Sequence, residues 1–212
     1  TGQSIFADRL LMLLSRDVLS RNNGATIIYD VKCSRHLGPV IKQAGGQPLM
    51  WKTGHSLVKA KMKETGALLG GEMSGHIFFK ERWLGFDDGL YTAARLLEIF
   101  SKSNQTVSSM FEAIPDDVST PELNIEVPDT EKFAIVERVA SIIADKGLPL
   151  STIDGVRVDL DSGWGLIRSS NTTPNLVLRF EAESTEALAE IQSTILDALK
   201  QAEPTLELGS IC

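Results

Sequence analysis

Short apolar runs alternate with stretches of helical periodicity through the first half of the 212-residue chain, and this alternation is the strongest constraint on its fold. The run TIIYDV, rich in β-branched residues, is followed by a helical pattern that ends at a glycine pair and then by a second apolar run. Strands separated by single helices are typical of parallel βαβ units. The predicted strands cover residues 26–31, 47–52, 67–71 and 77–80, and the predicted helices between and after them cover 35–44, 55–64 and about 87–100.

The helix expected near 87–100 begins at Asp87 and Asp88, acidic residues that suit an N-cap and the positive end of the helix dipole. Leu90, Ala94 and Leu97 recur at helical spacing and share one face, as in an amphipathic helix. We therefore interpret the two aspartates as helix-starting residues and not as metal ligands.

The second half of the chain has a different pattern. Apolar and polar residues alternate in several runs, which is typical of a sheet with one face toward water. The predicted strands cover residues 122–127, 152–160, 164–168 and 175–182, and the predicted helices cover 131–146 and 185–201. We expect an α/β domain with a mixed, mostly parallel sheet at 1–114, a hinge at 115–121, and a small α+β domain with an antiparallel sheet and two helices at 122–212.

Charge and composition exclude several classes of protein. The net charge is +4 over residues 1–114 and −11 over 115–212, so the whole chain is acidic, which disfavours a nucleic-acid partner. No apolar run is long enough to span a membrane, and no secretory signal precedes the first helix. Two cysteines, Cys33 and Cys212, are too few for a disulfide framework, so we expect a cytoplasmic protein with reduced thiols.

Three polar side chains follow predicted strands of the first half, where ligands bind in open parallel sheets. Lys32 comes after the first strand, His55 after the second and Glu72 after the third. A lysine, a histidine and a carboxylate at one sheet edge could bind a polar, anionic ligand that carries hydroxyl groups.

The segment GGEMSGH at 70–76 places Glu72, Ser74 and His76 among three glycines. In an extended segment Glu72 and Ser74 would point the same way and could bind adjacent hydroxyls of a sugar. An ordinary hairpin turn with solvated polar residues accounts for the same pattern, and composition alone favours that interpretation.

The loop RSSNTTP at 168–174 offers an arginine fork with hydroxyl and amide groups around it. Such a set could hold a phosphate, with Arg168 binding two oxygens and Ser170, Asn171 and Thr172 supplying further donors. A polar turn between two strands would have a similar composition, so this loop alone leaves both interpretations open.

These motifs together resemble the bacterial phosphomannomutase/phosphoglucomutase branch of the α-D-phosphohexomutases. The resemblance covers nearly the whole chain in order. It rests on DVKCSR at 30–35, WKTGHS at 51–56, GEMSGH at 71–76, HIFFKERWLGFDDGLYTAARLLEI at 76–99 and RSSNTTP at 168–174.

The resemblance implies roles for most of these residues. Glu72 and Ser74 would bind the sugar hydroxyls, and His76 would assist proton transfer or orient the reacting end. The implied phosphate-binding residues are Arg168, Ser170, Asn171 and Thr172, and the implied cleft-lining residues are Lys32, Gly54 and His55.

The resemblance also implies a four-domain enzyme, of which this chain matches the third and fourth domains. That enzyme interconverts the 1-phosphates and 6-phosphates of glucose or mannose through a phosphoserine and a bisphosphorylated sugar intermediate, with Mg²⁺ and glucose 1,6-bisphosphate as implied cofactors. The phosphoserine loop and the Asp-rich magnesium loop would lie in N-terminal domains missing here, and the sequence contains no D-x-D-x-D, so we expect no metal site in this chain.

Three hypotheses follow. In the first, the chain is the C-terminal half of such a mutase, binds glucose 1-phosphate, glucose 6-phosphate, mannose 1-phosphate or mannose 6-phosphate, and is inactive alone. The absence of an initiator methionine before Thr1 agrees with this expectation. In the second, it is a free-standing, non-catalytic module that binds sugar phosphates. In the third, it is only an interaction scaffold.

Overall fold

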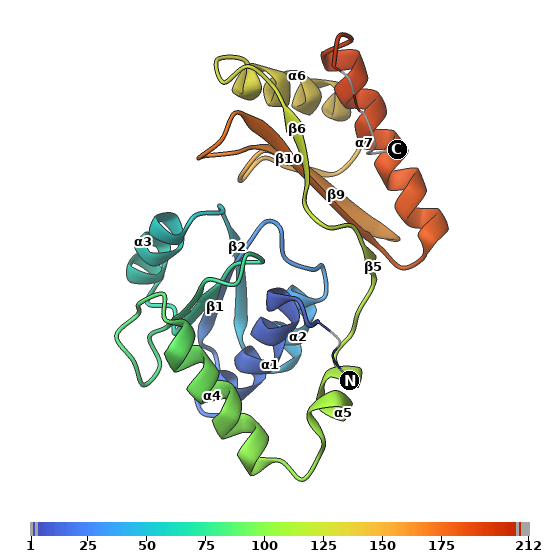
Figure 1. The fold of residues 1–212 in the computed structure, drawn as a ribbon. Helices are drawn as coiled ribbons and strands as arrows, with labels where there is room; N and C mark the ends of the chain where they lie inside the picture. Colours follow the sequence, from blue (N-terminus) through green and yellow to red (C-terminus); the bar gives the residue numbers. More distant parts are fainter. Residues whose placement is uncertain (1, 3, 207, 209–212) are drawn as a thin grey trace. The chain divides into compact units, whose positions relative to one another are not determined.

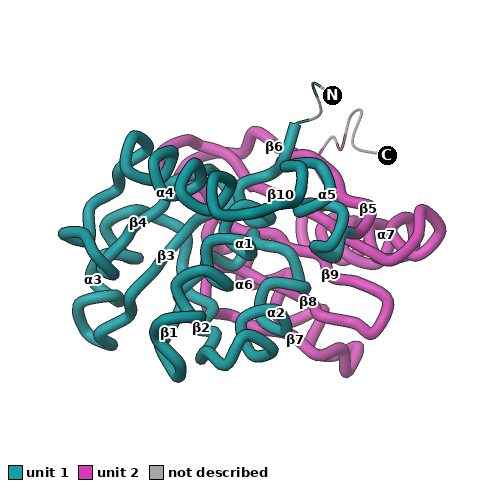
Figure 2. The backbone as a smooth tube through the Cα atoms, turned by 90° about the horizontal axis from the view of Figure 1, so that it is seen from below, with its two compact units in different colours: residues 1–116 teal, residues 117–212 magenta. Residues whose placement is uncertain are grey.

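The computed structural model describes residues 2, 4–206 and 208, which form two compact units (Figures 1 and 2). Unit 1 comprises residues 1–116 and unit 2 comprises residues 117–212. Each unit has its own sheet and its own apolar core. None of the helices in the described ranges is both long and apolar enough to cross a membrane.

Unit 1 is an α/β domain whose sheet has the strand order β2-β1-β3-β4. Strands β1, β2 and β3 are parallel and β4 is antiparallel to β3, so the predicted mixed, mostly parallel sheet is confirmed. The elements are α1 (Ala7–Leu19), β1 (Thr26–Asp30), α2 (Leu37–Gln43), β2 (Gln47–Trp51), α3 (His55–Thr65), β3 (Leu69–Gly71), β4 (Ile77–Phe79), α4 (Gly89–Lys102) and α5 (Val107–Glu112). The short helix α5 was not predicted from the sequence.

Two consecutive glycines in β3 allow helices to pack closely on both faces of this sheet. A Cβ atom on Gly70 would lie 2.9 Å from Sδ of Met62 in α3, whereas one on Gly71 would lie 2.7 Å from Leu11 in α1. The strand therefore lies between two helical layers without side chains of its own at these positions. This close packing fixes the position of the end of β3 and of the loop that follows it.

Helix α4 exposes the face that the sequence pattern marks as apolar. Leu90 and Leu97 are exposed, whereas Thr92 and Arg95 are buried. Asp88 caps the helix, because its side chain accepts a hydrogen bond of 2.9 Å from the backbone N–H of Tyr91. The predicted capping role is therefore confirmed for Asp88.

Unit 2 is an antiparallel sheet of order β5-β10-β9-β8-β7, with β6 also paired to β10, and two helices. The helices pack on the face that carries Ile167, Leu178 and Phe180, which confirms the predicted α+β class. The elements are β5 (Val118–Ser119), β6 (Leu123–Glu126), α6 (Lys132–Asp145), β7 (Leu150–Ser151), β8 (Val156–Leu160), β9 (Gly163–Ser169), β10 (Asn175–Ala182) and α7 (Thr185–Ala202).

The single strand predicted over 152–160 is wrong at its beginning. The chain turns between β7 and β8, and Gly155 adopts a φ of +84° that favours glycine. A Cβ atom there would lie 2.6 Å from Cβ of Arg168, so the turn passes directly over β9. This close approach brings Asp154 to Arg168.

Candidate functional site

The carboxyl ends of β1 and β3 form the edge of unit 1 at which a ligand is expected. The chain passes from β1 to β2 on one side and then crosses to β3 on the other side of β1, so the strand order reverses at this point. Crevices at such a reversal are the usual binding sites of open α/β sheets.

Asp30, the last residue of β1, joins the loops at this edge. Its carboxylate accepts hydrogen bonds from the hydroxyl of Thr53 at 2.9 Å, the backbone N–H of Met73 at 3.1 Å and the thiol of Cys33 at 3.1 Å. The side chain is fully buried. Asp30 therefore holds three separate loops in one arrangement, although the sequence analysis assigned it no role.

Glu72 lies at the centre of this edge and is only 2% exposed. One carboxylate oxygen accepts a 3.0 Å bond from the N–H of Gly54, and the other accepts a 3.2 Å bond from the hydroxyl of Ser74. Burial raises the pKa of the Glu72 carboxyl above its usual value, and the nearby Asp30 raises it further, while the bonds from Gly54 and Ser74 offset part of the increase.

A tight turn carries Ser74 and His76 next to Glu72. The backbone N–H of Glu72 donates to the carbonyl of His76, and the N–H of Gly75 donates to the carbonyl of Glu72. Ser74 and His76 are both exposed at this turn. The hydroxyl of Ser74 points at Glu72, so the two side chains that were expected to act on one ligand already contact each other.

Two histidine rings face each other across the site. The ring centroids of His55, the first residue of α3, and His76 are 6.1 Å apart. Nδ1 of His76 lies 2.5 Å from a carboxylate oxygen of Asp87. Asp87 thus contacts an imidazole, in addition to its position just before α4, and this partner was missed by the sequence analysis.

The remaining predicted residues of unit 1 lie at the same edge. Lys32 follows β1 and is buried, and Gly54 precedes α3. Gly54 has a φ of +138°, a conformation that favours glycine, and this directs its N–H to Glu72. The structure therefore brings together the loops that carry Lys32, His55 and Glu72.

The loop predicted to bind phosphate follows β9 in unit 2. Arg168 is buried, and its Nε donates a 2.9 Å bond to the carboxylate of Asp154. A longer contact of 3.4 Å joins its second nitrogen to the other oxygen of Asp154. The guanidinium therefore already has a carboxylate partner within its own unit.

Ser170 organises the rest of this loop. Its hydroxyl oxygen accepts hydrogen bonds from the backbone N–H groups of Thr172 and Thr173 and from the hydroxyl of Thr173, at 2.8 to 3.3 Å. Asn171 and Thr172 are exposed at the tip. Lys132, at the start of α6, is buried and donates to the carbonyl of Thr173 at 3.2 Å.

Sequence reasoning missed four residues that position the others. Asp30 is hidden inside an apolar run, and Lys132 is part of an unremarkable helix start. Asp87 has a simpler role as a helix-starting residue, and Asp154 lies within what reads as a strand. Only the glycine at 155 signals that a turn brings Asp154 back over β9.

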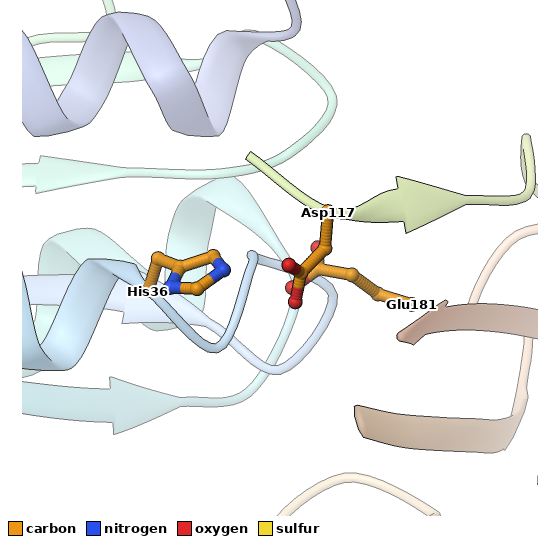
Figure 3. A group of neighbouring side chains, drawn as sticks. All are labelled: His36, Asp117 and Glu181. Atoms are coloured by element: carbon orange, nitrogen blue, oxygen red, sulfur yellow. The ribbon is translucent and has the colours of Figure 1, made fainter. Parts of the chain in front are cut away.

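Figure 3 shows two carboxylates of unit 2 that point toward one another, those of Asp117 and Glu181. Asp117 directly precedes β5, and Glu181 lies in β10, the strand with which β5 pairs. The third side chain in the figure, His36, belongs to unit 1.

Comparison with known families matches both units. Residues 6–118 match the family model described as phosphoglucomutase/phosphomannomutase, alpha/beta/alpha domain III. Residues 122–198 match the model described as phosphoglucomutase/phosphomannomutase, C-terminal domain. The two matches follow one another along the chain in the same order as the two units.

Individual relatives agree. A Pseudomonas putida phosphomannomutase/phosphoglucomutase is 60% identical over 209 residues, which cover 98% of this chain and 45% of the relative. A crystal structure of a Burkholderia thailandensis phosphoglucomutase/phosphomannomutase family protein is 54% identical, with a TM-score of 0.90 over 97% of this chain and 44% of the other. This chain thus spans less than half the length of these relatives.

A more distant structure shares the fold. An Aspergillus fumigatus N-acetylphosphoglucosamine mutase, solved in complex with GlcNAc-6P and magnesium, is 14% identical, with a TM-score of 0.62 over 92% of this chain and 46% of the other. At this identity the likeness shows the fold alone. The two family-model matches and the closer relatives show that this chain belongs to the phosphoglucomutase/phosphomannomutase family, of which it carries domain III and the C-terminal domain.

Proposed function

We propose that this chain is the substrate-binding half of a phosphohexomutase that interconverts the 1-phosphate and 6-phosphate of glucose or mannose. The observation that carries the proposal is the arrangement of Glu72, a buried carboxylate held at the reversal point of the sheet by neutral donors, with Ser74 and His76 on the same turn. Family membership supports it, and so do the relatives' names. Catalysis by the whole protein, through a phosphoserine and a bisphosphorylated sugar, is part of the same proposal.

Glu72 would bind the sugar through its hydroxyl groups. An ionised carboxylate accepts hydrogen bonds only, so it suits a ligand that offers several O–H donors. Ser74 would rotate its hydroxyl from Glu72 to a sugar oxygen, which frees one carboxylate oxygen for the ligand. The N–H of Gly54 would continue to hold the other oxygen and thus keep the carboxylate in place.

The loop after β9 would bind the phosphate that does not react. Arg168 would exchange part of its contact with Asp154 for phosphate oxygens, since both partners are anions that fit a guanidinium fork. Asn171 and Thr172 are exposed at the loop tip and would add donors, and Ser170 would keep the loop in shape.

His76 would move the proton. A neutral ring that donates Nδ1–H to Asp87 would keep Nε2 unprotonated and available to the ligand. That nitrogen would accept the proton of the sugar hydroxyl as its oxygen attacks the phosphoryl group, and would return it to the departing sugar oxygen in the reverse direction. Lys32 and His55 would supply positive charge and donors around the same ligand.

Flexibility between the two units would be concentrated at residues 115–117. The wider hinge expected at 115–121 includes β5, whose residues pair with β10, and Thr120, whose N–H donates to the carbonyl of Phe180. These bonds attach residues 118–120 to unit 2. We therefore place the bending within the three residues before β5.

Magnesium, which the family resemblance implies, does not fit the carboxylates of the candidate site. Asp30 already accepts three hydrogen bonds, and the N–H of Gly54 holds one oxygen of Glu72, so these two carboxylates leave few oxygens for an ion that requires octahedral coordination. Mg²⁺, like the phosphoserine, would therefore be held by the rest of the enzyme. Glucose 1,6-bisphosphate would bind as the intermediate, and the reaction would take place in the cytoplasm.

Calorimetry with glucose 1-phosphate tests the proposal. The parent chain should bind, and Glu72→Gln and Arg168→Gln should each weaken binding. Two exposed residues of α6 provide matched controls, Glu137→Gln and Arg138→Gln, which should bind like the parent. Parent-like binding by both site variants would contradict the site assignment.

A chimera separates the enzyme from a simple binding module. This chain would replace the matching segment of the Pseudomonas putida relative. Interconversion of glucose 1-phosphate and 6-phosphate by the chimera, lost in Glu72→Gln, supports the mutase. Sugar-phosphate binding without turnover would favour the non-catalytic module, and absence of both would favour a scaffold.

A further inference from the structure

Helix α4 is attached to unit 1 through a buried arginine as well as through apolar side chains, of which Leu96 and Ile99 pack against the core. Arg95, almost fully buried, forms salt bridges with Asp17 of α1 at 2.9 Å and with Glu81 at 2.7 Å. Its guanidinium also lies over the ring of Phe79 in β4, 4.6 Å from the centroid. Although burial by itself raises the pKa of the Asp17 carboxyl, hydrogen bonds from Arg21 and Arg95 hold it below its usual value. This network fastens the helix to α1 and β4.

The opposite side of α4 carries a row of apolar side chains that no described residue of unit 1 covers. Leu90 is 88% exposed and Leu97 is 66% exposed, and Ala93 and Ala94 are exposed between them. The spacing of three, four and seven residues places these four side chains on one face. We refer to Leu90, Ala93, Ala94 and Leu97 as the α4 stripe.

The segment before the helix extends this exposed surface. Trp83, Leu84 and Phe86 are 39%, 64% and 54% exposed, and Trp83 stacks on Tyr91 at a centroid distance of 4.3 Å. Five of the ten large apolar side chains that are exposed in the described ranges therefore fall within residues 83–97. Such a concentration is characteristic of interaction surfaces, whereas single exposed apolar residues are ordinary.

Charges beside the α4 stripe are already paired with each other. Glu98 forms salt bridges with Arg82 at 3.1 Å and with Lys102 at 2.7 Å. These contacts hold the pKa of the exposed Glu98 carboxyl at about 2. A partner therefore needs little charge of its own, and the surface suits an apolar face of another folded domain.

We propose that the α4 stripe and residues 83–86 form the surface on which the remainder of the full-length phosphomutase packs. This chain spans 45% of the Pseudomonas putida relative and 44% of the Burkholderia thailandensis protein, and it matches the models for domain III and the C-terminal domain. The unmatched part of each relative is therefore more than half of its length. In a folded full-length protein, that part packs against some surface of these two domains. The inference rests on family membership and is independent of the proposed chemistry.

Thiol accessibility tests this surface. Leu97→Cys, in a Cys212→Ser background, would be labelled with a maleimide in this chain and in the chimera with the Pseudomonas putida relative, and the modified site would be read by peptide mass spectrometry. Cys33 is buried and remains as it is. We expect labelling at position 97 to be at least about tenfold slower in the chimera, because folded domains exclude reagent from their interfaces.

Phe133→Cys on α6 of unit 2 is the matched control, since Phe133 is 58% exposed. It should be labelled equally fast in both proteins. Leu90→Cys repeats the test should Leu97→Cys fold poorly, and a cysteine at the aligned position of the relative itself repeats it should the chimera fail to fold. Equal labelling at position 97 in both proteins would overturn the proposal. So would protection that rises with concentration in this chain alone, which would indicate a second copy as the occupant.

Discussion

Glu72 in unit 1 and Arg168 in unit 2 are both buried charged side chains at the end of a strand, but they are held by partners of different kinds. Glu72 accepts from the neutral N–H of Gly54 and the hydroxyl of Ser74. Arg168 donates to Asp154, an opposite charge. Among the described residues Glu72 forms no salt bridge, although the nearby His76 favours its ionised form, whereas Arg168 forms a salt bridge with Asp154.

This difference determines what each ligand group must do on arrival. Burial makes the ionised form of the Glu72 carboxylate costly. Sugar hydroxyls that reach Glu72 donate hydrogen bonds to this carboxylate and thereby stabilise its ionised form. A phosphate that reaches Arg168 must share the guanidinium with Asp154, so its binding is an exchange between two anions. In unit 1 the ligand therefore adds hydrogen bonds to Glu72, whereas in unit 2 it replaces part of the existing contact between Arg168 and Asp154.

Arg168→Gln should have the largest effect, because it breaks a buried ion pair by removing one partner. Asp154 would lose this salt bridge in a mostly buried position, which costs about 3 kcal/mol in free energy of unfolding. Urea denaturation of parent and variant at neutral pH measures the difference. Arg138→Gln, which removes an exposed pair with Glu203, should cost less than about 1 kcal/mol. Equal stability losses in the two variants would contradict the view that Arg168 is compensated within its unit.

Glu72→Gln should not lower stability, in contrast to Arg168→Gln, but it should weaken binding strongly. The amide is isosteric and neutral, so it removes a costly buried charge and should leave unit 1 at least as stable as the parent at neutral pH. Loss of a charged acceptor should weaken glucose 1-phosphate binding roughly 10- to 100-fold, as expected for about 1.5–3 kcal/mol per hydrogen bond to a charge. Thermal unfolding and calorimetry on the same samples give both values. A clear loss of stability together with unchanged binding would show that Glu72 is a structural residue.

The places of Glu72 and Arg168 in the fold could be predicted from the sequence, although their partners could not. Strands followed by Lys32, His55 and Glu72 gave the correct edge of unit 1, because strand direction follows from the βαβ pattern alone. Periodicity also gave the antiparallel sheet and both helices of unit 2.

The partners of the site residues could not be predicted in this way. Asp154 reaches Arg168 only because Gly155 turns the chain over β9, and Asp30 meets Met73 across 43 positions of sequence. The exposure of the α4 stripe could not be predicted for a related reason. Periodicity identifies an apolar face but not what covers it, and here the buried side of the helix combines the ion pairs of Arg95 with other apolar residues, Leu96 and Ile99.

Asp154→Asn tests whether Asp154 competes with phosphate for Arg168 in unit 2. The amide oxygen can still accept from Nε of Arg168, but the competing negative charge is gone. Phosphate should therefore bind a few-fold more tightly than in the parent, a gain of about 1 kcal/mol that is smaller than the loss in Glu72→Gln, because the amide keeps a hydrogen bond to the guanidinium and only the charge is lost. Calorimetry with inorganic phosphate measures this change. Weaker binding would mean that Asp154 orients the guanidinium more than it competes for it.

The smallest expected effect is the pH dependence of the free energy of unfolding that Glu72 in unit 1 causes. Because the pKa of Glu72 is raised in the folded state, the folded protein binds more protons than the unfolded chain between the usual glutamate pKa and the raised one. The parent should therefore lose stability relative to Glu72→Gln as pH rises through this window, and the difference should be constant above it. The acid-sensitive pairs around Asp17 and Glu81 occur in both proteins and cancel in the difference. Urea denaturation of the two proteins from pH 4 to pH 8 measures the curve. A difference that grew as pH fell would mean that the bonds from Gly54 and Ser74 outweigh burial, and Glu72 would then be as well compensated as Arg168.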